Sequence, residues 1–155
     1  DPYTADTEKR IRIDGVAQIY AHFAHLTMGT KSYEAVIDNN TFAGIDMFGY
    51  NVTCIQSGVF IRDDGKAKAL IYAVINNCYN EYELQFDDNG YKNVNVTIYY
   101  GMDGQNGDWN NLAEIENVNE YPWNLPIKPH FENYVVQNPI KVILRPYDVM
   151  LLVLY

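Results

Sequence analysis

The segment GMDGQNGDWNN, residues 101–111, concentrates side chains that can bind a hard cation. Asn106, Asp108 and Asn110 follow one another at i, i+2 and i+4, which is how an oxygen-rich calcium loop begins. The sixth and twelfth positions, where an EF-hand needs glycine and a bidentate acid, are both asparagine. An EF-hand is therefore excluded. A looser calcium site built on Asp103, Asp108 and a backbone carbonyl is compatible with the sequence.

The same region also holds the ingredients of a carbohydrate site. Proteins stack the apolar face of a sugar on an aromatic ring, while amides and carboxylates bind its hydroxyl groups. Both tryptophans of the chain lie here, among asparagines and close to a tyrosine. The opposing interpretation is that the tryptophans fold inward and anchor a long loop. The predicted carbohydrate-binding residues are Trp109, Tyr121, Trp123, Asn110 and Asn111.

Catalytic chemistry has no comparable pattern. His22 and His25 could share a helix face, but no acid lies between them in the metalloprotease arrangement, and His130 is far along the chain. Nucleophile motifs such as Gly-x-Ser-x-Gly and phosphate-binding loops are absent from the sequence. A glycosidase-like pair among the 20 acidic residues cannot be located from sequence. We expect a non-catalytic protein.

The elements that must position these side chains are predominantly short β-strands. Apolar and aromatic runs recur about every ten residues, with polar turns between them, which is typical of an antiparallel β-sandwich of Greek-key or jelly-roll type. Residues 101–129 form the one long segment without periodicity, and such loops are often functional. The predicted strands are KSYEAVID, GYNVTCI, GVFIR, AKALIYAVI, NEYELQF, KNVNVTIYY, YVVQ, KVILR and VMLLVLY.

One helix is predicted, over residues 14–28, after a polar lead-in at residues 1–13. Asp14 can cap its start and Gly29 can end it. Five apolar residues recur at helical spacing in this stretch: Val16, Ile19, Tyr20, Phe23 and Leu26. The competing interpretation is a strand through RIRIDGVAQIYAHFAHL, in which apolar residues also alternate.

Two hairpins are predicted. Asp64-Gly65 supplies the positive-φ residues of a tight two-residue turn between GVFIR and AKALIYAVI. Near the end, PYD joins KVILR to VMLLVLY, with Pro146 and Tyr147 forming the corner. The terminal run is either an ordinary central strand, which that hairpin favours, or an edge strand through which copies of the chain associate.

Composition excludes several partners. The formal net charge is −9, and the eleven lysines and arginines form no basic patch, so nucleic acids and anionic membranes are disfavoured. No run reaches the roughly 18 apolar residues that span a bilayer. At 155 residues the chain has the size of one domain.

Several features bear on compartment. The chain does not begin with Met, which favours a processed chain or an excised domain. Asn39, Asn51 and Asn95 match the glycosylation acceptor pattern. Cys54 and Cys78 allow a single disulfide, but two separate buried thiols are the favoured interpretation. We expect an extracellular or surface-exposed protein.

Two stretches resemble the C-terminal β-sandwich domain that follows the catalytic barrel of many glycoside hydrolases. They are SGVFIRDDGKAKALIYAVINN, residues 57–77, and IKVILRPYDVMLLVLY, residues 140–155. The resemblance covers about two thirds of the chain, and the first 50 residues lie outside it. It implies a non-catalytic accessory domain that supports a barrel or contributes to glycan binding.

Together these observations predict one β-sandwich domain with a short N-terminal helix. The expected function is that of a carbohydrate-associated accessory or carbohydrate-binding module, with a glycan or polysaccharide as partner and calcium as the one candidate cofactor. The alternative is a structural or receptor-binding subunit of a viral, phage or cell-surface assembly that forms a homo-oligomer through an edge strand. A small secreted enzyme is the third interpretation.

Overall fold

The structure, a computed structural model, describes residues 15–37, 43–46, 48–101 and 129–155. The described chain is mainly β, with antiparallel strands and one helix, as predicted. The strand interpretation of residues 14–28 is therefore wrong. The elements are α1 (Gly15–Thr27), β1 (Lys31–Glu34), β2 (Ala43–Ile45), β3 (Asn51–Thr53), β4 (Ile55–Asp63), β5 (Lys68–Asn76), β6 (Tyr82–Phe86), β7 (Asn93–Tyr99), β8 (His130–Val135), β9 (Ile140–Leu144) and β10 (Val149–Leu154).

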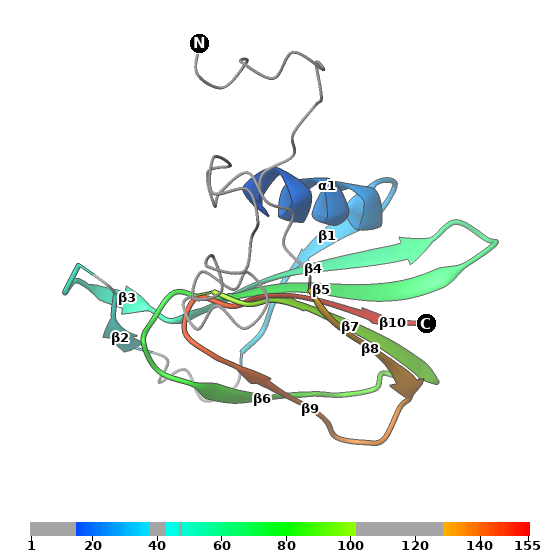
Figure 1. Ribbon diagram of the computed structural model, residues 1–155. Coiled ribbons are helices and arrows are strands. Elements are labelled where there is room, and N and C mark those ends of the chain that lie inside the picture. Colours follow the sequence, from blue (N-terminus) through cyan, green and yellow to red (C-terminus); the bar gives the residue numbers. More distant parts are fainter. Residues whose placement is uncertain (1–14, 38–42, 47, 102–128) are drawn as a thin grey trace, which may run out of the picture.

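The main layer is a six-stranded antiparallel sheet in the order β1-β4-β5-β10-β7-β8. Strands β6 and β9 pair with each other in a two-stranded sheet, and β2 and β3 form a separate hairpin. Figure 1 shows the β6–β9 sheet below the main sheet and α1 above it. The arrangement is an open sandwich with a helix on its outer face.

Strand β10 lies at the centre of the main sheet, between β5 and β7. Its inner side chains, including Met150 and Leu152, are fully buried, and Leu151 on its other face is only 2% exposed. Burial on both faces explains why this run is continuously apolar. The central-strand interpretation is thus confirmed, and the prediction of an edge strand is wrong. The hairpin prediction is also wrong, because β9 pairs with β6 and belongs to the other layer.

The core fills the space between the two layers. Side chains from β4, β5, β7 and β10 meet side chains from β6 and β9, because every second residue of each strand points inward. Strand β9 shows this alternation most clearly, with its first, third and fifth residues buried and the other two exposed. The buried residues of this cluster are Ile55, Val59, Leu70, Val74, Leu84, Val94, Val96, Ile98, Ile140, Val142, Leu144, Met150, Leu152 and Leu154.

The chain crosses from one layer to the other through the corner between β9 and β10. Asp148, 1% exposed, accepts the backbone N–H of Gly101 at 2.9 Å and that of Arg145 at 2.8 Å. The buried Asn76 donates from its side chain to the carbonyl of Arg145 at 3.0 Å. Tyr147 has a φ of 61°. These bonds hold the corner, which sequence analysis placed within a hairpin.

The β4–β5 hairpin is confirmed, but its turn is longer than predicted. Asp63 pairs with Lys68, so four residues form the turn, and within it Gly65 has a φ of 78°. The carboxylate of Asp64 accepts the backbone N–H groups of Lys66 and Ala67, both at 2.9 Å. These hydrogen bonds lower the pKa of Asp64. The turn uses an aspartate cap in place of a second positive-φ residue.

Helix α1 packs on the outer face of the main sheet through aromatic side chains. The Phe23 and Phe60 rings meet edge to face at 5.4 Å, and the hydroxyl of Tyr99 lies 2.8 Å from Nδ1 of His22. Arg62 donates to the carbonyl of Leu26 at 2.8 Å, which places a positive charge at the helix C-terminus. Gly29, with a φ of 75°, follows the helix end as predicted.

The apolar stripe predicted for α1 is partly wrong. The described side chains that turn toward the sheet include Ile19, His22, Phe23 and Leu26, all half-buried, whereas Tyr20 is 71% exposed. His22 therefore belongs to the face of α1 that contacts the sheet, although the apolar pattern did not include it.

The partial burial of His22 gives the fold a dependence on pH. Burial lowers the pKa of His22, and the nearby His25 lowers it further. A lowered folded-state pKa means that neutral His22 stabilises the fold above the unfolded value of about 6.5, and that this contribution is lost as the pH falls through the folded value. We expect the free energy of unfolding to fall between pH 7 and pH 5, and His22→Gln to flatten that fall in urea denaturation. An equally steep fall in the variant would contradict this assignment.

Cys54 and Cys78 form a disulfide, with a Cα–Cα distance of 5.0 Å, so the favoured interpretation of two separate thiols is wrong. Both half-cystines are fully buried. The bridge lies beneath the β2–β3 hairpin, because a Cβ added to Gly44 would collide with Sγ of Cys54 and would lie 2.9 Å from Sγ of Cys78. Only glycine lets β2 pass this close to the bridge. The disulfide thus joins the hairpin to the end of β5.

Candidate functional site

The residues predicted from sequence to bind calcium or carbohydrate lie outside the described part of the chain. These are Asp103 and Asp108 for calcium, and Trp109, Asn110, Asn111, Tyr121 and Trp123 for carbohydrate. Both assignments stay predictions. Among the described residues, no group of three or more histidines, cysteines, aspartates and glutamates is arranged to hold a metal ion.

A groove opens between the two layers of the sandwich, beside strand β6. Its volume is about 680 Å³, within the range of about 300 to 1,000 Å³ usual for small-molecule sites. We call it the interlayer groove. Its apolar lining residues are Ala35, Val36, Ile37, Ile55, Val74, Leu84, Phe86 and Pro139, and its polar or amphipathic ones are Ser57, Tyr72, Glu83, Gln85, Asp87 and Asn89.

The groove exists because the second layer is narrower than the first. In the described part of the chain, β6 pairs only with β9, so its other edge faces the inner side of β4 and β5 without a neighbouring strand. Inward-facing residues of the main sheet, among them Ile55 and Val74, therefore form the floor of an opening. The topology builds the groove, and no local sequence motif marks it.

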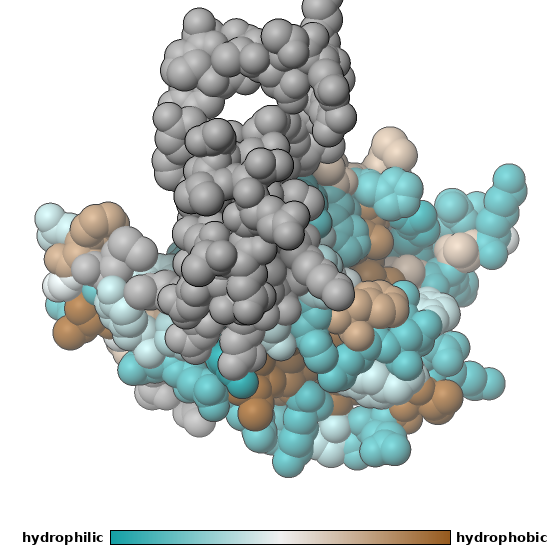
Figure 2. Space-filling view, in the orientation of Figure 1, coloured by the Kyte–Doolittle hydropathy of each residue, from teal (hydrophilic) through white to brown (hydrophobic). Residues whose placement is uncertain are grey.

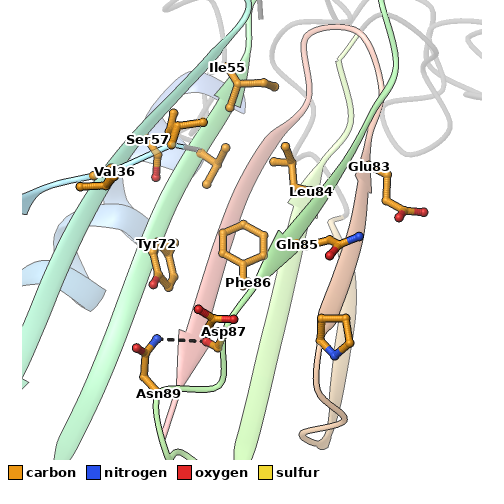
Figure 3. A pocket seen from close by; sticks show the side chains of 14 residues that line it. Val36, Ile55, Ser57, Tyr72, Glu83, Leu84, Gln85, Phe86, Asp87 and Asn89 are labelled. Atoms are coloured by element: carbon orange, nitrogen blue, oxygen red, sulfur yellow. Dashed lines mark hydrogen bonds between the residues drawn. The ribbon is translucent and has the colours of Figure 1, made fainter. Parts of the chain in front are cut away.

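Two aromatic rings lie in the groove. Tyr72 projects from β5 and Phe86 from β6 toward the same space, as Figure 3 shows. Their ring centroids are 5.0 Å apart and their planes are tilted by 58°. Both side chains are half-buried and pack against the core at one edge. They offer a fixed aromatic surface, which is what an apolar sugar face or another flat ligand needs.

Polar groups gather beside these rings at one end of the groove. The side-chain amide of Asn89 donates to the carbonyl of Asp87 at 3.0 Å, drawn as a dashed line in Figure 3. Burial raises the pKa of the Tyr72 hydroxyl and the charge of Asp87 raises it further, while a hydrogen bond with the Asn89 side chain opposes both. The hydroxyl therefore stays protonated at neutral pH, when it can both donate and accept.

The remaining acidic residue of the groove lies on its rim. Figure 3 shows Glu83 and Gln85 on the side of β6 opposite to Tyr72, while Leu84 and Phe86 lie on the near side. Glu83 is exposed, and its carboxylate is 3.8 Å from Nζ of Lys141 on β9. Glu83 and Asp87 thus do not face each other across the groove.

A second aromatic group lies where the main sheet meets residues 102–128. The Arg145 guanidinium lies 5.8 Å above the Tyr100 ring, within the range of a cation–π contact. Tyr100 is also 6.1 Å from the ring of His130, whose Nε2 is 2.8 Å from a carboxylate oxygen of Glu132. His22 on α1 contacts Tyr99 of β7, whereas His130 lies beside Tyr100 and Glu132. Among the described residues, His22, His25 and His130 form no metal-binding group.

The β2–β3 hairpin exposes three large apolar side chains. Ile45, Phe48 and Tyr50 are 54%, 76% and 68% exposed, and Figure 2 shows brown, apolar atoms on this hairpin at the left. The carboxylate of Asp46 accepts the backbone N–H groups of Phe48 and Tyr50, both at 2.9 Å, and so fixes the turn. These side chains lie outside the lining of the interlayer groove.

Two of the three acceptor asparagines are described. Asn51 begins β3 and is exposed, whereas Asn95 on β7 is half-buried and lies 3.5 Å from the hydroxyl of Tyr155. Asn39 lies outside the described residues. Within the described residues, no helix is long and apolar enough to cross a membrane.

The chain matches no protein-family model and no curated protein. Among solved structures it is similar to an arabinofuranosidase, at 14% identity and a TM-score of 0.44, over 81% of this chain and 24% of that one. It is also similar to the thermostable GH51 α-L-arabinofuranosidase from Thermotoga petrophila RKU-1, at 14% identity and a TM-score of 0.45, over 82% of this chain and 24% of that one. The chain thus spans about a quarter of the length of each. Both neighbours are glycoside hydrolases.

Proposed function

We propose that this chain is a non-catalytic carbohydrate-binding module and that the interlayer groove holds a segment of its glycan. The observation that carries the proposal is the composition of the groove. Two fixed aromatic rings, Tyr72 and Phe86, lie next to a carboxylate and an amide, Asp87 and Asn89. Sugars present both an apolar face and a set of hydroxyl groups, and this combination of side chains complements both.

The sequence supports the same function from a different part of the chain. The segment that contains Trp109, Tyr121 and Trp123 is rich in aromatic rings and amides, and its ends adjoin Tyr100 and His130 at the end of the sheet. It stays a predicted second contact region.

We also propose that the protein is extracellular or surface-exposed. The buried disulfide between Cys54 and Cys78 supports this location, because such bridges persist mainly in oxidising compartments. A module that binds polysaccharide would meet its ligand there. Mass spectrometry of the secreted protein, with and without reductant, would show whether the bridge is formed.

The proposal is tested by a glycan array followed by calorimetry on the polysaccharides that bind. The groove variant combines Asp87→Ala with Asn89→Gly. Glycine tolerates the φ of 50° at position 89, so the change removes the amide without straining the turn. We expect the double variant to bind at least about tenfold more weakly, because a hydrogen bond to a charged group contributes about 1.5 to 3 kcal/mol.

A matched control is available on the other face of the molecule. Tyr20→Ala removes an exposed aromatic ring from α1, which lies on the opposite side of the main sheet (Figure 1), and should leave affinity unchanged. Equal losses in both variants would contradict the assignment to the groove. If the protein binds none of the polysaccharides on the array, the proposed function is wrong. Repeating the array with a chelator tests the predicted calcium site.

The alternative, a subunit that assembles edge to edge, would use a different strand from the one predicted. In the described sheet, β1 and β8 are the outer strands, and β8 exposes Phe131 and Val135 at 59% and 70%. Unpaired edges of this kind can recruit another strand. Light scattering after size-exclusion chromatography separates the two functions, because an assembly subunit would increase in mass with concentration.

A further inference from the structure

A second groove adjoins the interlayer groove at the end of the main sheet. Its volume is about 510 Å³, and it shares Asn89 with the interlayer groove. It lies where β5 and β7 begin and β10 ends. We call it the lysine groove, because two of its seven lining residues are lysines. The lining residues are Lys68, Asn89, Gly90, Tyr91, Lys92, Asn93 and Tyr155.

The ridge between the two grooves is a well-bonded turn. Asn89 and Gly90 both have positive φ, 50° and 83°. The carboxylate of Asp88 accepts the N–H of Gly90 at 2.9 Å, and its carbonyl accepts the N–H of Tyr91 at 2.9 Å. The ridge is therefore ordered before a ligand arrives, which lowers the entropic cost of binding across it.

The far wall of the lysine groove is held in the same way. The carbonyl of Tyr155 accepts the backbone N–H of Lys92 at 3.3 Å and that of Asn93 at 3.0 Å. The hydroxyl of Tyr155 donates to Asn133 at 3.3 Å. Lys68, at the start of β5, and Lys92, just before β7, thus lie on either side of the end of β10.

The charges of this groove differ from those of the protein as a whole. Lys92 is exposed and forms no ion pair with a carboxylate in the described part of the chain. Lys68 is 3.8 Å from a carboxylate oxygen of Asp63, but both side chains are largely exposed, and such pairs exchange partners at little cost. The net charge of −9 repels anions at long range. At physiological salt, however, screening confines that repulsion to about 8 Å. The lining of the groove carries two ammonium groups and no acidic side chain, and the carboxylates of Asp63 and Asp88 lie beside it.

We propose that the glycan of the interlayer groove is acidic, and that one of its carboxylate or sulfate groups binds between Lys68 and Lys92. This inference rests on the proposed function and names its ligand class. A polysaccharide strand would lie along Tyr72 and Phe86, cross the ridge at Asn89 and place its anionic group in the lysine groove. Neutral glycans would bind in the interlayer groove without any additional affinity from the lysine groove.

The test is calorimetric titration of the intact chain with three probes: polygalacturonate, a sulfated galactan and a neutral galactan. We expect at least one acidic polymer to bind about tenfold more tightly than the neutral one, and the advantage to shrink as sodium chloride is raised. The two acidic probes distinguish a carboxylate from a sulfate. Lys92→Gln should remove most of the advantage, and Lys68→Gln a part of it.

Lys31→Gln is the matched control, because Lys31 is exposed on β1 and lines neither groove. It should leave all three affinities within twofold. Equal affinities for acidic and neutral polymers, or no effect of Lys92→Gln, would overturn the inference and leave the proposed function standing. Absence of binding to any glycan would overturn both.

Discussion

Replacing Cys54 and Cys78 together by alanine is expected to lower the free energy of unfolding by at least about 3.5 kcal/mol. The bridge closes a loop across a separation of 24 residues, and in the loop-entropy model this restricts the unfolded chain by about that amount. Both half-cystines are fully buried, so the variant also loses packing. The effect is large compared with the roughly 5 to 15 kcal/mol that stabilises a typical domain.

Guanidinium denaturation of the oxidised and reduced wild type supplies the control. Reduction breaks the bridge but keeps both sulfur atoms in place, so it measures the cross-link without the loss of packing. We expect reduction to account for most of the change, and the β2–β3 hairpin to lose amide protection first because Gly44 packs on the bridge. A change of less than about 1 kcal/mol on reduction would show that the bridge does not limit the unfolded chain.

The second large effect is expected at Asp148. Alanine there leaves the N–H groups of Gly101 and Arg145 without their acceptor in the corner between the layers. An unsatisfied buried donor costs about 1 to 3 kcal/mol, so we expect a loss of about 3 kcal/mol in urea denaturation. Asp148→Asn keeps one acceptor oxygen and should lose about half as much.

The control for Asp148 is Asp63→Asn, which removes an exposed carboxylate that pairs with Lys68. Exposed pairs contribute about 0 to 1 kcal/mol, so this change should be nearly silent. Equal losses from Asp63→Asn and Asp148→Ala would mean that general charge effects, and not the corner, explain the result.

Local signals in the sequence predicted most of the elements. Alternating residues marked β6 and β7, a short apolar run marked β9, and the helical spacing with Gly29 marked α1. These features depend on neighbours along the chain, so periodicity reveals them. The pairing of β9 with β6 depends instead on a corner held by Asp148 and Asn76, whose partners lie up to 69 residues away. The sequence of an apolar run followed by Pro-Tyr is the same whether the next strand pairs with that run in one sheet or crosses to the other layer.

The interlayer groove could not be predicted from the sequence either, because it also depends on how distant strands are arranged. Tyr72 stands in the run ALIYAVI, whose continuous apolar residues are typical of a buried central strand, and Phe86 ends an ordinary alternating strand. In the part of the chain that the structure describes, no strand pairs with the other edge of β6, and this opens the groove in which both rings lie. The number of strands in each layer is a property of the topology. From the sequence, Asp87 and Asn89 could be recognised only as residues typical of a turn. The disulfide was missed because two cysteines at this separation fit a bridge and two separate thiols equally well.

Binding of a glycan in the interlayer groove can be followed residue by residue through amide chemical shifts. The ¹⁵N-labelled chain would be titrated with a polysaccharide selected on the array. We predict that the largest shift changes fall on Tyr72, Phe86, Asp87 and Asn89, with none on Tyr20 of α1. Saturating shifts confined to other parts of the chain, with these four amides unmoved, would place the glycan outside the interlayer groove.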